Sequence, residues 1–252
     1  MAWANLNTLG STSDKTANQA STTITMGLAA VEAGNVIVLI IAVDNNATTD
    51  TDEGAVTSIT DTQLNTYSKA KEFTNGQGSA QAGATCSIWY SLITTTIPQT
   101  TGVITVNFNN STSRDASAIS TREFSIGAGN VVTVEASNTL ANDAADPGSL
   151  DTTTSNAAFL RIRGIASETN DTTALTVTTN WTAMTGANTS GNPTASNMGV
   201  RGEFRISTGT TDASDPGYVT ADHASCYVAL KEAAPALSTG VKNSLAMCGC
   251  GI

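Results

Sequence analysis

The chain has 252 residues and a formal net charge of −10, and only 13% of its residues are charged. Its 11 lysines and arginines are too few to coat a nucleic-acid backbone, because phosphate binding depends on basic side chains. The longest apolar run, Val36–Val43, is too short to cross a bilayer as a helix. The composition therefore predicts a protein that makes no direct contact with nucleic acid or membrane.

The first residues carry neither the basic region nor the long apolar segment of a secretory signal. We therefore expect a soluble protein that is made in the cytoplasm. Residues 1–20 are polar with isolated apolar anchors such as Trp3 and Leu6, which predicts an N-terminal arm or a first edge strand.

Short apolar or alternating segments, separated by Thr, Ser, Asn, Gly and Asp, then follow one another as far as residue 234. Such segments predict β-strands. Val36–Val43 does not alternate, so we expect it at the centre of a sheet with both faces covered. One helical turn is conceivable at Ala29–Ala33. The expected strands are 22–28, 36–43, 56–60, 66–70, 84–93, 102–108, 116–124, 131–137, 157–166, 175–181, 200–207 and 224–231.

About a dozen strands without helical crossovers cannot build a parallel α/β sheet, so they should pair antiparallel in two stacked sheets. The predicted fold class is all-β, an antiparallel two-sheet β-sandwich with jelly-roll or Greek-key topology. Residues 21–234 would form this sandwich, and a division near 138–156 stays open. Residues 235–252 would form a C-terminal tail.

Two groups of acidic residues could supply the oxygen ligands that Ca²⁺ prefers. The first group is Asp44, Asp50 and Asp52, and the second is Asp212, Asp215 and Asp222. Neither group has the spacing of a helix-loop-helix calcium site, so hydrated loops are the simpler interpretation. We expect no metal and no cofactor.

A nucleophilic enzyme would need a base, and His223 is the only histidine of the chain. We expect His223 to be a surface residue at the start of a strand. A glycosidase needs two carboxylates at a defined separation, and a chain this acidic offers many pairs by chance. We therefore expect no catalytic residue and predict that the protein is not an enzyme.

The aromatic residues and the cysteines complete the list of candidates. We expect Trp89 and Trp181 to pack in the core, whereas Tyr218 follows Pro216-Gly217 and is the better candidate for an exposed ring. Cys86 and Cys226 lie in expected strands and should be buried thiols. Cys248 and Cys250 form one Cys-x-Cys in the tail, which does not make a zinc site.

The order of several short motifs carries a resemblance. These motifs are Gly34-Asn35 before an apolar strand, Thr57-Ser58-Ile59-Thr60-Asp61 with Asn65-Thr66-Tyr67, Trp89-Tyr90, Gly102 to Val106, Glu123-Phe124, Asn180-Trp181-Thr182 and Glu203-Phe204. The pattern resembles a β-sandwich domain, jelly-roll-like, that is common in virion structural proteins of tailed bacteriophages. Leu64 departs from it, because such turns usually carry Gly just before the Asn.

The resemblance implies a structural role in a virion that assembles in the host cytoplasm. We expect a capsid decoration or cement subunit that binds the major capsid protein or other virion proteins, as a homo-oligomer such as a trimer. Trp3, Leu6, Tyr218, Cys248 and Cys250 are the interface candidates, since termini lie at the surface and order on docking. The alternatives are a head or tail fibre or spike that binds host glycans, and third a secreted carbohydrate-active enzyme or binding module.

Overall fold

The structure is a computed structural model that describes residues 3–109, 112, 114–191 and 196–235. These residues form fourteen strands and no α-helix, so they include no helix that could span a membrane. The strands are β1 (Ala4–Asp14), β2 (Ser21–Thr25), β3 (Asn35–Asp44), β4 (Val56–Asp61), β5 (Ser68–Asn75), β6 (Ala84–Leu92), β7 (Val103–Phe108), β8 (Ser117–Ser125), β9 (Val131–Ala145), β10 (Ala158–Glu168), β11 (Thr182–Ala183), β12 (Ala187–Asn188), β13 (Met198–Thr208) and β14 (Ala221–Ala233).

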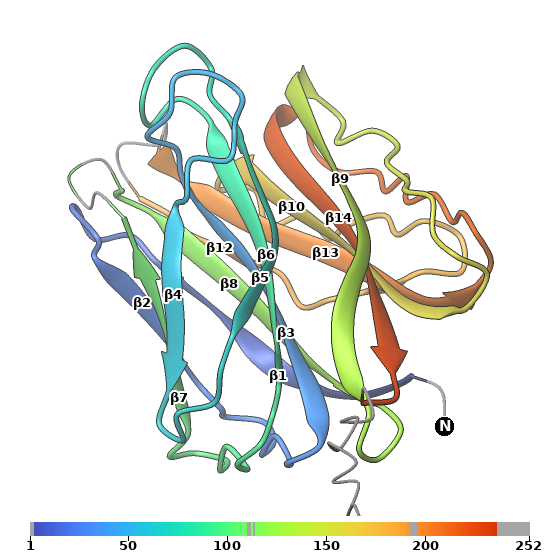
Figure 1. The fold of residues 1–252 in the computed structure, drawn as a ribbon. Helices are drawn as coiled ribbons and strands as arrows, with labels where there is room; N and C mark the ends of the chain where they lie inside the picture. Colours follow the sequence, from blue (N-terminus) through green and yellow to red (C-terminus); the bar gives the residue numbers. More distant parts are fainter. Residues whose placement is uncertain (1–2, 110–111, 113, 192–195, 236–252) are drawn as a thin grey trace, which may run out of the picture.

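The strands pair antiparallel in three sheets (Figure 1). A central sheet has the order β1-β8-β3-β6-β5. An outer sheet has the order β11-β13-β10-β14-β9, with β12 also on β13, and a small sheet has the order β2-β7-β4. The all-β sandwich predicted from the sequence is thus confirmed, and the small sheet adds a third layer that was not predicted.

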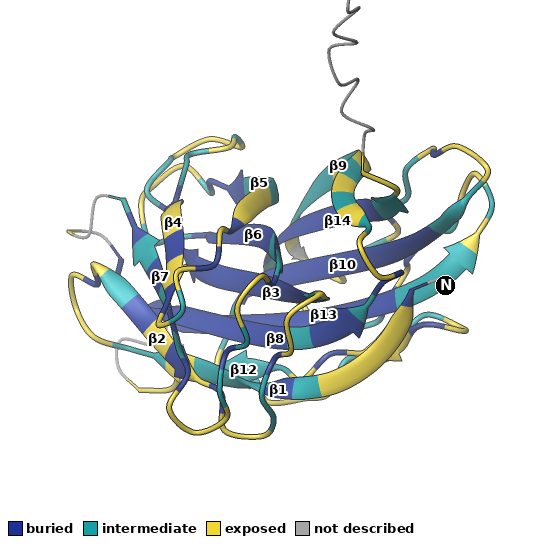
Figure 2. Cartoon of the chain, turned by 60° about the horizontal axis from the view of Figure 1, so that its bottom comes forward, coloured by how far each residue is buried: buried dark blue, intermediate teal, exposed yellow. Residues whose placement is uncertain are grey.

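The central sheet has a hydrophobic core on each face. Successive side chains of a strand point to opposite faces, so Val38 and Ile40 of β3 pack toward the outer sheet, whereas Leu39 and Ile41 pack toward the small sheet. Figure 2 shows β3 buried along its length between its neighbours. The prediction that Val36–Val43 is covered on both faces is confirmed.

A pair of glycines lets the two large sheets approach each other closely. Gly164 of β10 and Gly202 of β13 are register partners. A Cβ on Gly164 would lie 2.8 Å from Ile40 Cγ2 and 3.1 Å from Cys86 Sγ, and a Cβ on Gly202 would collide with Ile40 Cδ1. Ile40 therefore occupies a notch that only glycine can provide.

Three local predictions were wrong. The expected strand Leu175–Trp181 is a loop that makes one bridge, between Thr176 and Gly217, because this segment covers the outer sheet and joins no ladder. β9 runs eight residues beyond Ser137, to Ala145, because its polar second half pairs with β14. The helical turn at Ala29–Ala33 is absent, because Val31 bridges Ile97.

Candidate functional site

The outer face of the outer sheet is covered by loops. Alternation along β10 turns Leu160 and Ile162 toward the central sheet and turns Arg161 and Arg163 toward these loops. Both arginines are fully buried. A small apolar cluster of Leu150, Trp181 and Tyr227 lies on the same face and anchors the loops to the sheet.

The two buried arginines bind the backbone of the loops above them. Arg161 Nη2 donates to Gly209 O at 2.8 Å, and Arg163 Nη2 donates to Pro147 O at 3.1 Å and Gly148 O at 3.2 Å. Burial lowers the pKa of Arg163 to about 10, which still leaves it charged at neutral pH. These cations hold the loops in place, and no outside ligand can reach them.

Buried carboxylates do the same work with the opposite charge. Glu203 accepts hydrogen bonds from Thr178 N at 2.8 Å, Thr178 Oγ1 at 2.6 Å and Ser214 Oγ at 2.6 Å. Glu72, on β5, accepts from Ala55 N at 2.6 Å and Val56 N at 3.2 Å. Each of these acids satisfies backbone donors that would otherwise be buried without a partner.

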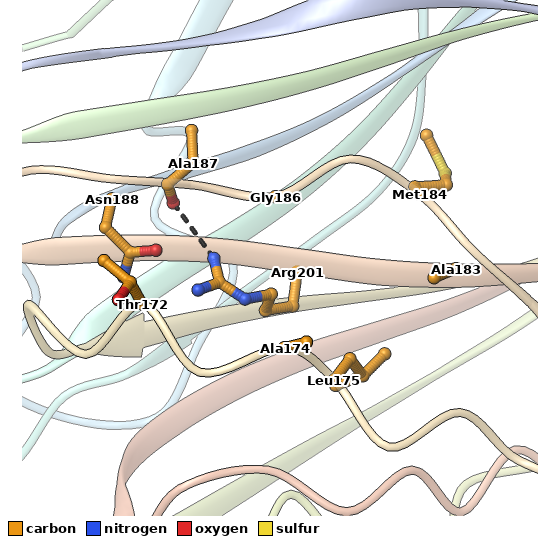
Figure 3. Close-up of a pocket in the computed structure, with 9 residues that line it drawn as sticks. All are labelled: Thr172, Ala174, Leu175, Ala183, Met184, Gly186, Ala187, Asn188 and Arg201. Carbon is orange, nitrogen blue, oxygen red and sulfur yellow. Dashed lines mark hydrogen bonds between the residues drawn. The ribbon is translucent and has the colours of Figure 1, made fainter.

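A cavity of about 360 Å³ opens between residues 172–175 and the edge segment 183–188 (Figure 3). Met184 and Leu175 supply apolar surface, and Arg201 lies between the two walls. Arg201 makes five hydrogen bonds of 2.8–3.3 Å to backbone carbonyls, so its donors are already engaged. The cavity can therefore receive a small neutral or apolar group, and it offers no free cation.

A second cavity, of about 410 Å³, is lined by Glu168 and Asp222 among other residues. Burial raises the pKa of Glu168 to about 8, and repulsion from Asp44 and Asp222 adds to the shift. Glu168 is therefore largely protonated at neutral pH. A protonated carboxyl at the wall of an open cavity can donate a proton to a bound molecule.

The three calcium candidates of the first acidic group each bind a different partner within the chain. Asp44 Oδ2 accepts from Asp115 N at 2.8 Å, and burial raises the pKa of Asp44 to about 7. Asp50 accepts from Gly76 N at 3.1 Å, and Asp52 pairs with Lys69 at 3.1 Å. No three acidic, His or Cys side chains in the described part of the chain are placed to hold a metal ion together.

His223 lies at the start of β14 but is fully buried, which corrects the expectation of a surface residue. Its Nδ1 lies 2.7 Å from Ser167 Oγ and its Nε2 lies 2.9 Å from Val219 O. A carbonyl can only accept, so Nε2 carries the proton and Nδ1 accepts from the serine. Burial lowers the pKa of His223, and Ser167 is equally buried, so the pair presents no nucleophile to solvent.

Two of the interface candidates are less exposed than expected. Trp3 is buried in the core between the central and outer sheets, where its large indole ring contributes apolar surface to the cluster. Tyr218 is half-buried: its hydroxyl donates to Asp171 O at 3.0 Å, and the Arg201 guanidinium lies 5.0 Å from its ring centre. Neither ring is a free platform for a ligand.

The remaining candidates divide between exposed, buried and undescribed positions. Leu6 is exposed on β1. Trp89 and Trp181 are buried, as predicted. Cys86 and Cys226 are buried free thiols, and burial raises the pKa of Cys226. Cys248 and Cys250 lie outside the described residues.

Sequence reasoning missed Glu168 and Arg201, which line the two cavities. Glu168 lies two residues beyond the expected strand 157–166 and Arg201 lies in the expected strand 200–207, and nothing in their immediate neighbours sets them apart. Their roles come from loops that fold over them from elsewhere in the chain, so no local signal could have revealed them.

Comparisons with known proteins do not place the chain in a family. No family profile, no curated protein and no solved structure matches it.

Proposed function

We propose that this protein is a non-enzymatic structural subunit of a tailed-bacteriophage virion, a decoration subunit that stabilises the shell by binding neighbouring capsid proteins. Its work would be mechanical. A stiff block that binds two shell subunits at once raises the free energy needed to separate them.

The observation that carries the proposal is how the chain uses its buried charge. Arg161, Arg163, Glu72 and Glu203 are all fully buried, and all four bind backbone or side-chain groups of loops. Loops tied in this way lose little further conformational entropy when a partner docks on them. That suits a rigid connector better than an enzyme whose loops must open and close.

The motifs that carry the phage resemblance support the same interpretation. Asp61 accepts hydrogen bonds from Gln63 N, Asn65 N, Asn65 Nδ2 and Tyr67 Oη at 2.7–3.2 Å. The Asp-x3-Asn-x-Tyr motif thus builds a turn and performs no chemistry. A family of structural proteins would be expected to share motifs that specify a turn, as this one does.

The test is to locate the chain on the particle of the virus that encodes it. Mass spectrometry of purified particles should find the chain at a fixed ratio to the capsid protein, and electron microscopy should place it on the shell. A chain found free in the lysate and absent from every particle would refute the proposal.

One observation favours a second function, glycoside processing. Glu168, with its pKa near 8, and Asp222 line one open cavity, and two carboxyl groups are the minimum that glycoside hydrolysis needs. Among the described residues, no aromatic side chain lines that cavity to stack on a sugar ring. Purified protein that releases reducing sugar from host-surface polysaccharide, and loses this activity in Glu168→Gln, would establish the second function in place of the first.

A further inference from the structure

Exposed apolar side chains gather at one end of the molecule. The described residues include five exposed large apolar side chains: Leu6 (41%), Leu28 (63%), Leu64 (88%), Val131 (37%) and Val177 (37%). The first four belong to the start of β1, the β2–β3 loop, the β4–β5 loop and the start of β9, and these segments lie at the lower end in Figure 1. Val177 lies in the loop that covers the outer sheet. Scattered apolar residues need no explanation, but four of five near one end do.

The strand register places these residues at that common end. Ala4 and Asn35 both pair with Ser125, so the start of β1, the start of β3 and the end of β8 coincide. Val131 pairs with Ala233, so β9 begins where β14 ends. The described part of the chain therefore begins and ends at this end of the molecule.

Three loops form the tip of this end, namely residues 26–34, 62–67 and 94–102. They are bonded to one another: Thr94 N and Thr95 N donate to Asn65 Oδ1 at 2.9 Å, and Gln99 Nε2 donates to Leu28 O at 3.2 Å. Figure 2 brings this end forward and shows the loop tips and the start of β1 largely exposed. Leu28 and Leu64 are therefore presented on loops with a fixed shape.

Leu64 is the most informative residue of the tip. Its φ of +60° lies in the left-handed region, which Gly adopts freely, Asn tolerates and most other side chains disfavour. The Asp61 turn and the Asn65 bonds hold it there. Its side chain is also 88% exposed, so it gains nothing by packing within the chain. A residue that is unfavourable both in backbone conformation and in exposure points to an outside contact.

The chemistry of the three loops limits what this contact can be. They hold no Lys or Arg, which excludes phosphate groups and anionic membrane surfaces. Their one aromatic residue, Tyr67, is buried, which excludes stacking on a sugar. Their one charged residue is Glu32, and the rest of the rim is Thr, Gln and backbone. Exposed leucines among uncharged polar groups suit contact with a protein surface.

We propose that this end is the docking face of the protein and that Leu64, with Leu28 beside the same loops, inserts into an apolar pocket of a shell protein. The inference rests on the proposed virion role and adds the surface and the anchor residue.

The test measures binding of the full-length chain to shells that were assembled without it, by co-sedimentation over a concentration series. Leu64→Asn removes the apolar anchor, and Asn adopts the left-handed backbone conformation at little energetic cost. Leu28→Ser removes the second anchor, and Val177→Ser is the matched control, because it removes an exposed apolar residue from another face. We expect Leu64→Asn to bind at least tenfold more weakly with no loss in melting temperature, Leu28→Ser to weaken binding, and Val177→Ser to bind like the wild type.

Other results would overturn the inference in distinguishable ways. Equal binding by the wild type and Leu64→Asn would reject this docking face and leave the virion role intact. A wild-type chain that binds no shell would reject the virion role, and the docking face with it. A wild-type oligomer that Leu64→Asn converts to monomers, with shell binding unchanged, would show that the face meets a second copy of this chain.

Discussion

Substitution of Gly202 by alanine tests how closely the two large sheets pack. A Cβ at this position would collide with Ile40 Cδ1 and would lie 2.9 Å from the carbonyl oxygen of Arg163. Ile40 is fully buried on the central strand β3, so neither the side chain nor the backbone can move far. Overpacking of a tight core costs roughly 1–3 kcal/mol, and two close contacts place Gly202→Ala at about 3 kcal/mol.

A double-mutant cycle with Ile40→Val separates this collision from other effects of the added methyl group. Ile40→Val removes Cδ1 and should cost about 1 kcal/mol by itself. In the double mutant the new Cβ occupies the space that Cδ1 left, so the combined loss should be smaller than the sum by about 1 kcal/mol or more. Urea denaturation followed by tryptophan fluorescence measures all four proteins. Additive losses, or a Gly202→Ala variant as stable as the wild type, would refute the close approach.

Three further substitutions test the buried acids and the exposed turn. Asp44→Asn should raise the free energy of unfolding by up to about 4 kcal/mol near pH 8 and leave it unchanged near pH 3. The reason is that the pKa of Asp44 is about 7 in the folded chain and 3.8 in the unfolded chain, so the ionised carboxylate destabilises the fold increasingly as the pH rises between those values. Equal gains in denaturation experiments at both pH values would contradict this. Leu64→Gly should raise the free energy of unfolding by about 0.5–1 kcal/mol, because it relieves the left-handed backbone, and a lower melting temperature would count against that. Asp61→Ala should cost about 3 kcal/mol, because it leaves the buried Tyr67 hydroxyl and Asn65 amide without their acceptor, and hydrogen exchange of the turn as slow as in the wild type would speak against it.

Local sequence patterns predicted those features of the fold that depend only on the sequence of a single strand. The unbroken apolar run Val36–Val43 could only be a strand covered on both sides, and it is. The third layer could not be predicted in the same way. β2, β4 and β7 look like other alternating strands, and whether they extend a large sheet or form a small one depends on pairings between distant segments.

The errors have a common physical cause. Residues 175–181 combine three threonines with Leu175, Val177 and Trp181, which is a pattern typical of a strand. The same residues also suit a loop that lies over a sheet and packs against it through Trp181. The polar sequence of the second half of β9 predicts a loop, and only its pairing with β14 makes it a strand. Tertiary contacts overrode the local preference in both cases.

The candidate sites were the least predictable part. The pKa values of Asp44 and Glu168 are raised because they are buried among chain segments far apart in sequence. Arg201 donates to carbonyls of β12 and of the loop at residues 171–173. The one local clue was Leu64, which departs from the expected glycine in its turn and emerges as the most exposed of the large apolar side chains in the described residues.

The proposed role is tested most directly by the temperature at which shells fall apart with and without this chain. Shells assembled without it should lose their contents at a lower temperature, and added purified protein should restore the wild-type value while Leu64→Asn restores less of it. Shells that disrupt at the same temperature whether or not the protein is bound would contradict a stabilising role.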